Sequence, residues 1–149
     1  MANHQVRNTG SVAGNLMMAR CHGFSSDVTT LLMGAGGTIT FKLMAVGAAG
    51  QAVPAGDLPD HTLGVHAFLH AEHPAGTAVL VTSIAVPYLE AGQHFATYRA
   101  ALRPVNAHAL LNAAFLIRVS PEDGTVTDAS LVYGVAQLRA CYAEEAQAA

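Results

Sequence analysis

One polar segment, residues 7–16, and the bend that follows it combine residue types that can hold a phosphate-bearing ligand. The glycines let the backbone turn tightly and bring backbone N–H groups close to a ligand. The serine and asparagine add side-chain donors, and an aspartate at the end of the bend accepts hydrogen bonds from hydroxyl groups. The residues concerned are Gly10, Ser11, Gly14, Asn15 and Asp27. The pattern favours a loop that binds a ribose-containing cofactor, but glycine-rich turns are common and usually only structural.

Four histidines form a second group of candidate ligands, and His66, His70 and His73 stand at i, i+4 and i+7 on one face of a predicted helix. Zinc sites use such spacing, and Glu72 could assist. Because no cysteine joins them and glycine, proline and alanine flank them, we expect a solvated histidine-rich surface and no metal site. The role of these three histidines, and of His61 just upstream, stays open.

Ser25 and Ser26 precede Asp27 and raise another alternative, a catalytic nucleophile. The G-x-S-x-G turn that holds the serine nucleophile of many hydrolases is not present in this segment. Serine and aspartate are also preferred caps of helix N-termini, and an apolar run follows at residues 28–33. The segment is therefore predicted to cap a short helix that ends at Gly34.

The composition of the 149-residue chain favours one domain, or one small domain and part of another. Hydrophobic residues make up 52% of the chain, which is enough for a core, whereas charged residues make up only 11%. Globular proteins carry roughly 25% charged residues. With so little charge to cover its surface, the chain is expected to bury part of that surface against another segment or a partner domain.

Charge and cysteine usage exclude several classes of function. The net charge of −3 gives no electrostatic footprint for nucleic acid, so no nucleic-acid partner is expected. No apolar run reaches the roughly 18 residues of a membrane span, so no membrane association is expected, and the first residues do not form a signal peptide. Cys21 and Cys141 stand too far apart for a metal or redox motif, which indicates free thiols in a reducing, cytoplasmic compartment.

Hydrophobic periodicity predicts an α+β fold. The predicted strands are residues 38–43, 79–86, 93–100, 109–120 and 126–135. Residues 109–120 could also be helical by pattern alone, but a Pro-Glu-Asp-Gly turn follows them, so a hairpin with the next strand is favoured. Elsewhere, residues 5–7 are predicted to end a strand, 20–23 to form a bend, 47–60 to form a loop, and 61–72 and 139–149 to form helices.

Several blocks of the sequence resemble molybdo-flavoenzymes, the xanthine dehydrogenase and aldehyde oxidase family. Residues 6–16, Val-Arg-Asn-Thr-Gly-Ser-Val-Ala-Gly-Asn-Leu, resemble the family's IRN-x-x-S-x-GGN segment. Residues 24–32 resemble the FPSDV-x-T-x-LL stretch of plant-type aldehyde oxidases, and residues 81–87 resemble LLSI-x-IP. Residues 95–104 resemble FETYRAAPRP of the plant enzymes, and Leu-Asn-Ala-Ala-Phe follows at 111–115. The blocks occur in one colinear order, which is a far stronger signal than a lone glycine motif.

The resemblance implies roles for individual residues in binding FAD. Ser11 and Asn15 of the loop would lie against the pyrophosphate of FAD. Asp27 would lie against the polar chain of the cofactor, and Val81 against the flavin. Arg99 stands where xanthine dehydrogenases have a lysine, so a planar guanidinium replaces the point charge of an ammonium group. The cofactor-binding residues that the resemblance implies are Ser11, Gly14, Asn15, Asp27, Val81 and Arg99. It implies no catalytic residue and no metal ligand in this chain.

The resemblance also divides the chain into the C-terminal part of a PCMH-type FAD-binding domain, residues 1–90, and the start of a CO dehydrogenase flavoprotein-like C-terminal domain, residues 91–149. In the family, electrons pass from substrate at molybdenum through iron–sulfur clusters and FAD to oxygen or NAD. The parent enzyme is expected to be a homodimer that carries a molybdenum cofactor and 2Fe-2S clusters in domains outside this chain. We expect the chain, as a fragment without the family's first glycine loop, to bind FAD weakly or not at all and to be inactive alone. The alternative is a non-catalytic remnant or interaction module that has lost the cofactor.

Overall fold

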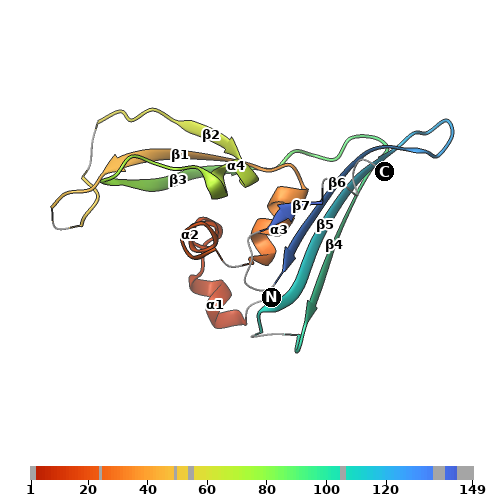
Figure 1. Cartoon of the computed structure of the whole chain (residues 1–149), viewed down its shortest axis with the longest axis horizontal. Coiled ribbons are helices and arrows are strands. Elements are labelled where there is room, and N and C mark those ends of the chain that lie inside the picture. The colour runs from red at the N-terminus through yellow and green to blue at the C-terminus, as the bar shows by residue number, and fades with distance from the viewer. Residues whose placement is uncertain are drawn as a thin grey trace.

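The computed structural model describes residues 3–23, 25–48, 50–53, 56–104, 107–135 and 140–143. These described residues form four short helices and two antiparallel sheets (Figure 1). The helices are α1 (His4–Thr9), α2 (Val12–His22), α3 (Asp27–Gly34) and α4 (Val65–His70). The strands are β1 (Thr38–Ala45), β2 (His61–Gly64), β3 (Thr77–Ala85), β4 (Gln93–Ala101), β5 (Ala109–Val119), β6 (Val126–Val135) and β7 (Cys141–Tyr142). The predicted α+β class is confirmed.

The two sheets come from consecutive parts of the chain. The first has the strand order β2-β1-β3, and β1 pairs with β3 from Thr38 opposite Ala85 to Ala45 opposite Thr77. The second has the order β4-β5-β6-β7, in which each strand pairs with the next along the chain. All five predicted strands are present, and β5 and β6 form the predicted antiparallel hairpin.

Helix α3 lies between the two sheets and joins them (Figure 1). It contacts β5 and β6 of the second sheet as well as α2 and α4, and α4 in turn contacts β1 and β2 of the first sheet. The helix approaches β5 closely at Gly34, where an added Cβ would lie only 2.4 Å from the Cβ of Ala114. Two small residues at this contact therefore set the distance between α3 and the second sheet.

The hydrophobic core lies where α2, α3 and α4 meet the first sheet. Phe68 of α4 is fully buried, and its ring packs edge-on against Phe41 with 5.3 Å between the centroids. The guanidinium of Arg20 lies over the Phe68 ring, 5.0 Å from its centroid, and donates to the backbone carbonyls of Phe68 and Ala71. Other fully buried side chains are Leu16, Met33, Ile39 and Val132.

The N-terminal segment differs from the prediction. Residues 5–7 belong to helix α1 and not to a strand, because the Asn3 side chain accepts a hydrogen bond from the Val6 N–H and caps that helix. The predicted loop at residues 7–16 is shorter than expected, since α2 already begins at Val12. This helix continues through the predicted bend to His22 and ends at Gly23, which has a φ of 65°.

Two other helix predictions were wrong in part. Residues 61–72 divide into strand β2 and helix α4, because residues 38–41 of β1 pair with His61–Gly64 before the apolar helical pattern begins. Within the predicted helix 139–149, Cys141 and Tyr142 form strand β7, which pairs with β6. Residue 139 and residues 144–149 of that prediction lie outside the described residues.

Candidate functional site

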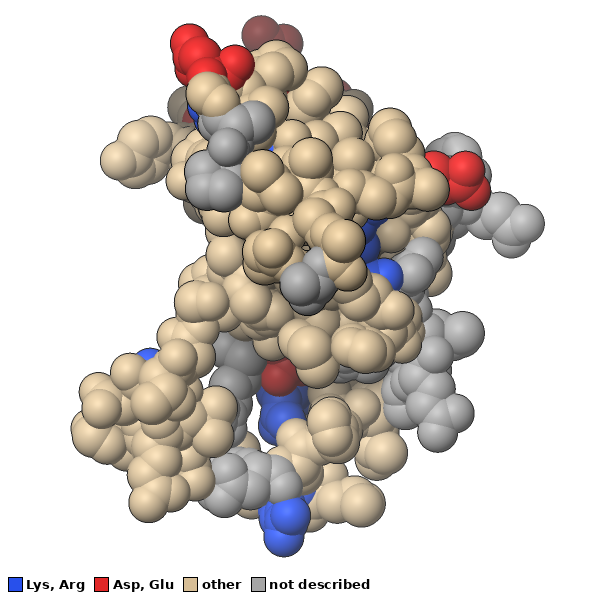
Figure 2. Space-filling view, turned by 90° about the vertical axis from the view of Figure 1, so that its left-hand side faces the viewer, with Lys and Arg blue, Asp and Glu red and all other residues tan. Residues whose placement is uncertain are grey.

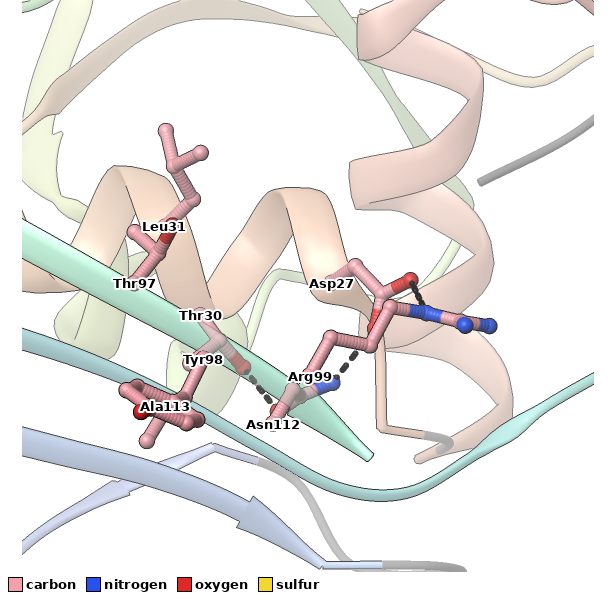
Figure 3. A pocket seen from close by; sticks show the side chains of 8 residues that line it. All are labelled: Asp27, Thr30, Leu31, Thr97, Tyr98, Arg99, Asn112 and Ala113. Carbon is pink, nitrogen blue, oxygen red and sulfur yellow. Dashed lines mark hydrogen bonds and ion pairs between the residues drawn. The ribbon is translucent and has the colours of Figure 1, made fainter. Parts of the chain in front are cut away.

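An ion pair between Asp27 and Arg99 joins helix α3 to the second sheet. Ser26 is the N-cap of α3, as predicted, and its Oγ accepts a hydrogen bond from the Thr29 N–H at 3.1 Å. Asp27 is thus the first residue of the helix, where a carboxylate interacts favourably with the helix dipole. Arg99 of β4 donates from Nε to Asp27 Oδ2 at 2.7 Å (Figure 3). A second guanidinium nitrogen of Arg99 donates to the Ala107 carbonyl.

A buried asparagine holds the other oxygen of the same carboxylate. Asn112 of β5 is 2% exposed, and its Nδ2 donates to Asp27 Oδ1 at 2.9 Å and to Ser25 Oγ at 3.1 Å. Its Oδ1 accepts from Thr30 Oγ1 of α3 at 2.7 Å (Figure 3). Both oxygens of Asp27 are therefore fixed by side chains from two different strands.

This network lines a small cavity of about 150 Å³. Its lining residues are Asp27, Thr30, Leu31, Thr97, Tyr98, Arg99, Asn112 and Ala113. The cavity can take a few polar atoms, such as part of a hydroxylated chain, but not a whole dinucleotide. Uncharged side chains cover most of the face in Figure 2, and an acidic and a basic group are visible side by side in a hollow in its lower half.

The loop residues Ser11, Gly14 and Asn15 lie at the start of α2. Ser11 is the N-cap of this helix, and its Oγ accepts a hydrogen bond from the Gly14 N–H at 3.0 Å. An added Cβ at Gly14 would lie 2.9 Å from that Oγ, so glycine keeps the first turn of the helix tight. Asn15 accepts a hydrogen bond from the Ser26 hydroxyl, which connects this turn to the cap of α3.

The remaining predicted site residue lies elsewhere. Val81 is a half-buried residue of β3 that packs against the hydrophobic core and does not line the cavity. The structure thus brings Asp27 and Arg99 into direct contact, connects Asn15 to them through the α3 cap, and leaves Val81 in the other sheet. The role of each residue in holding a cofactor stays a prediction.

Asn112 and Thr30 are site residues that the sequence reasoning missed. The available signal was an asparagine in the middle of the apolar strand β5, where a side chain facing a helix has no water to bind. Such a residue needs partners inside the protein, and α3 supplies them. Ser25, considered above as a nucleophile, is one of these partners.

The four histidines form two separate groups. The rings of His66 and His70 lie 4.7 Å apart on the exposed side of α4, whereas His61 and His73 line a groove of about 500 Å³ beside Phe41. Among the described residues, no group of three or more histidine, cysteine, aspartate or glutamate side chains is placed to hold a metal ion.

His73 is expected to make the stability of the chain depend on pH. Burial lowers the pKa of His73 below its usual value of 6.5, and the charges of Arg20 and His61 lower it further. Between that lowered pKa and 6.5 the unfolded chain binds a proton that the folded chain does not, so stability falls as the pH drops through this range. Urea titrations at about pH 7.5 and about pH 5.5 measure the loss.

The matched comparison is between His73→Gln and His94→Gln, since His94 is an exposed histidine of β4. His73→Gln should reduce the loss of stability at acid pH, whereas His94→Gln should leave it as it is. An equal loss in the native chain and in His73→Gln would assign the pH dependence to other groups.

No helix of the described ranges is long and apolar enough to cross a membrane. Both cysteines, Cys21 and Cys141, are exposed free thiols. Their positions on α2 and β7 place them away from the Asp27–Arg99 cavity, whose lining contains no cysteine.

Comparison with known protein families agrees with this architecture. Residues 96–149 match the family model of the CO dehydrogenase flavoprotein C-terminal domain, a range that includes most of β4 and all of β5 to β7. These residues are thus similar to the C-terminal domain of a molybdo-flavoenzyme flavoprotein. The sequence relatives of the chain are plant aldehyde oxidases: the chain is 33% identical over 136 residues to the probable aldehyde oxidase 3 of rice, Oryza sativa subsp. japonica, and 36% identical over 125 residues to aldehyde oxidase 4 of Arabidopsis thaliana.

The alignments cover most of this chain but little of the relatives. They include 87% of the chain and 9% of the rice protein, and 80% of the chain and 8% of the Arabidopsis protein. Among solved structures, carbon monoxide dehydrogenase of Hydrogenophaga pseudoflava matches 99% of the chain with a TM-score of 0.70 and 23% identity, over 46% of that protein chain. Quinoline 2-oxidoreductase of Pseudomonas putida 86 matches with a TM-score of 0.65 and 22% identity. These structures share the fold.

Proposed function

We propose that this chain is an FAD-holding segment of an aldehyde oxidase-like molybdo-flavoenzyme. The observation that carries the proposal is the arrangement of the start of α2 and the start of α3, which are joined by the Ser26–Asn15 hydrogen bond. This arrangement places a glycine-containing helix N-terminus close in structure to the Asp27–Arg99 pair. The helix N-terminus is suited to a pyrophosphate, and the Asp27–Arg99 pair is suited to the hydroxyl groups of a polar chain.

The donor set fits such a cofactor. The first N–H groups of a helix lack partners within the helix, so the 11-residue α2 can donate to an anion at its start. Gly14 leaves the surface of that turn free of a side chain, and Ser11 carries a hydroxyl there. In the second part of the site, Asp27 would accept from hydroxyl groups while Arg99 neutralises its charge.

FAD, when bound, would supply the electron-accepting chemistry between iron–sulfur clusters and oxygen or NAD. The residues of this chain would bind and orient that cofactor, and the molybdenum site would belong to other domains of the parent enzyme. Very exposed apolar side chains support contact with such domains: Tyr88 is 97%, Leu102 86% and Tyr98 73% exposed. The free thiols of Cys21 and Cys141 agree with a cytoplasmic enzyme.

The test is a titration of the purified chain with FAD, followed by flavin fluorescence and visible absorption, with riboflavin as the ligand that lacks the pyrophosphate. We expect weak binding of FAD and weaker binding of riboflavin. Ser11→Asp should lower the FAD affinity at least about tenfold, because a negative charge would face the pyrophosphate. Aspartate caps a helix as well as serine does, so the variant should melt at the same temperature as the native chain.

Ser11→Asn is the matched control, since asparagine also caps the helix and carries no charge. It should bind FAD much as the native chain does. Equal affinity of the native chain for FAD and riboflavin would contradict binding of the pyrophosphate at the start of α2. Equal affinity of the two Ser11 variants for FAD would contradict it as well. If the native chain binds neither flavin, the alternative of a remnant or interaction module without cofactor is favoured.

A further inference from the structure

The side chain of Asn112 uses its whole polar group inside the protein. Its amide nitrogen donates to the Asp27 carboxylate and to the Ser25 hydroxyl, and its oxygen accepts from the Thr30 hydroxyl. The residue is 2% exposed, and Thr30 is 1% exposed, so water cannot replace these bonds without opening the contact between α3 and β5.

The space for this side chain comes from the neighbouring strand. Asn112 stands opposite Gly134 of β6 in the sheet. A Cβ added to Gly134 would lie 2.0 Å from Asn112 Oδ1 and 2.8 Å from Thr30 Oγ1. The backbone of Gly134 has no positive φ, so the need for glycine here is one of space alone.

Asn112 and Arg99 act on different oxygens of one carboxylate. Arg99 Nε binds Oδ2 of Asp27 at 2.7 Å, and Asn112 Nδ2 binds Oδ1 at 2.9 Å. One bond would leave the carboxylate free to rotate about χ2, a broad torsion, whereas two bonds from separate strands fix the plane of the group. The Asp27 side chain is 20% exposed, so the open part of the carboxylate is small and its direction matters.

We propose that Asn112 is a positioning residue, which holds the Asp27 carboxylate in the orientation that binds Arg99 and presents it to the cavity. The value of this orientation for a cofactor rests on the proposed function, whereas the coupling between Asn112 and the Asp27–Arg99 pair does not. Gly134 is part of the same arrangement, because the absence of a side chain there leaves room for Asn112 between the sheet and α3.

The experiment compares two substitutions on the same hydrogen-bond network in the 149-residue chain. Asn112→Leu removes the donor to Asp27, and Thr30→Val removes only the bond on the other side of the asparagine. The first readout is the Arg99 Nε–H signal in the ¹⁵N–¹H NMR spectrum and its exchange with water. The second is the affinity for FAD.

In Asn112→Leu we expect the Arg99 Nε–H signal to move toward that of a free arginine and to lose at least about tenfold of its protection from exchange, while FAD binding weakens about tenfold. Thr30→Val should lose stability but keep the Arg99 Nε–H signal and its protection from exchange within about twofold. Asn112→Ser, which is smaller and polar, replaces Asn112→Leu if the latter does not fold.

An Arg99 signal that stays unchanged in the Asn112 variant, or that changes equally in Thr30→Val, would overturn the proposal and leave Asn112 a purely structural residue. If the native chain binds no FAD, the proposed function fails, but the Arg99 signal still decides whether Asn112 positions the carboxylate. A changed Arg99 signal together with weaker FAD binding in the Asn112 variant would support both the positioning role and the proposed function.

Discussion

Replacing Gly134 by alanine is expected to lower the free energy of unfolding by about 3 to 5 kcal/mol, because overpacking and lost buried hydrogen bonds add. The new methyl group would lie 2.0 Å from Asn112 Oδ1, 2.6 Å from Ser25 Oγ and 2.8 Å from Thr30 Oγ1. Moving these polar groups apart would leave buried donors and acceptors without partners. Urea unfolding, with the midpoint and slope compared to those of the native chain, measures the loss.

Two further variants separate steric conflict from the general effect of adding a methyl group. Gly64→Ala places a methyl where nothing lies within 4 Å, and it should change stability by less than about 1 kcal/mol. Asn112→Ala removes the closest of the three oxygen atoms that a methyl group on residue 134 would meet. The double variant should therefore be more stable than the sum of the two single losses predicts, and strict additivity would contradict the proposed clash.

The elements that the sequence predicted well are those whose local signals agree with their tertiary surroundings. The strands β1, β3, β4, β5 and β6 combine apolar runs or alternation with turn residues at their ends. The cap at Ser26 is equally local, because its side chain needs only the N–H three residues later. Glycine at position 34 also ends α3 as expected, but the structure gives it a second role in the close approach to Ala114.

The parts that were missed depend on contacts between distant residues. Residues 5–7 look extended by type, yet a cap at Asn3 is enough to start a helical turn there. Residues 61–64 precede a helical pattern, but pairing with β1 keeps them extended. The hydrogen bonds of Asn112 to Asp27 and Thr30 span more than 80 positions, so no local pattern could identify them.

Removing the Asp27 carboxylate is expected to lower the free energy of unfolding by about 2 to 4 kcal/mol, since both Arg99 and Asn112 would lose a charged partner. The side chains of Arg99 and Asp27 are 23% and 20% exposed, so water offsets only part of the loss. Arg99→Ala should cost less, because Asp27 keeps the Asn112 bond. In a double-mutant cycle of the two alanine variants, we expect a coupling energy above about 1 kcal/mol.

The ion pair between Arg118 and Glu90 is the matched control for this cycle. Its nitrogen–oxygen distance is also 2.7 Å, but the two side chains are 36% and 68% exposed. The same cycle on this pair should give a coupling below about 1 kcal/mol, because solvent screens exposed charges. Because both pairs join an arginine to a carboxylate at equal distance, a larger coupling at Asp27–Arg99 reports burial and the bond from Asn112. Equal couplings would mean that the carboxylate at the start of α3 is held no more firmly than one at the surface.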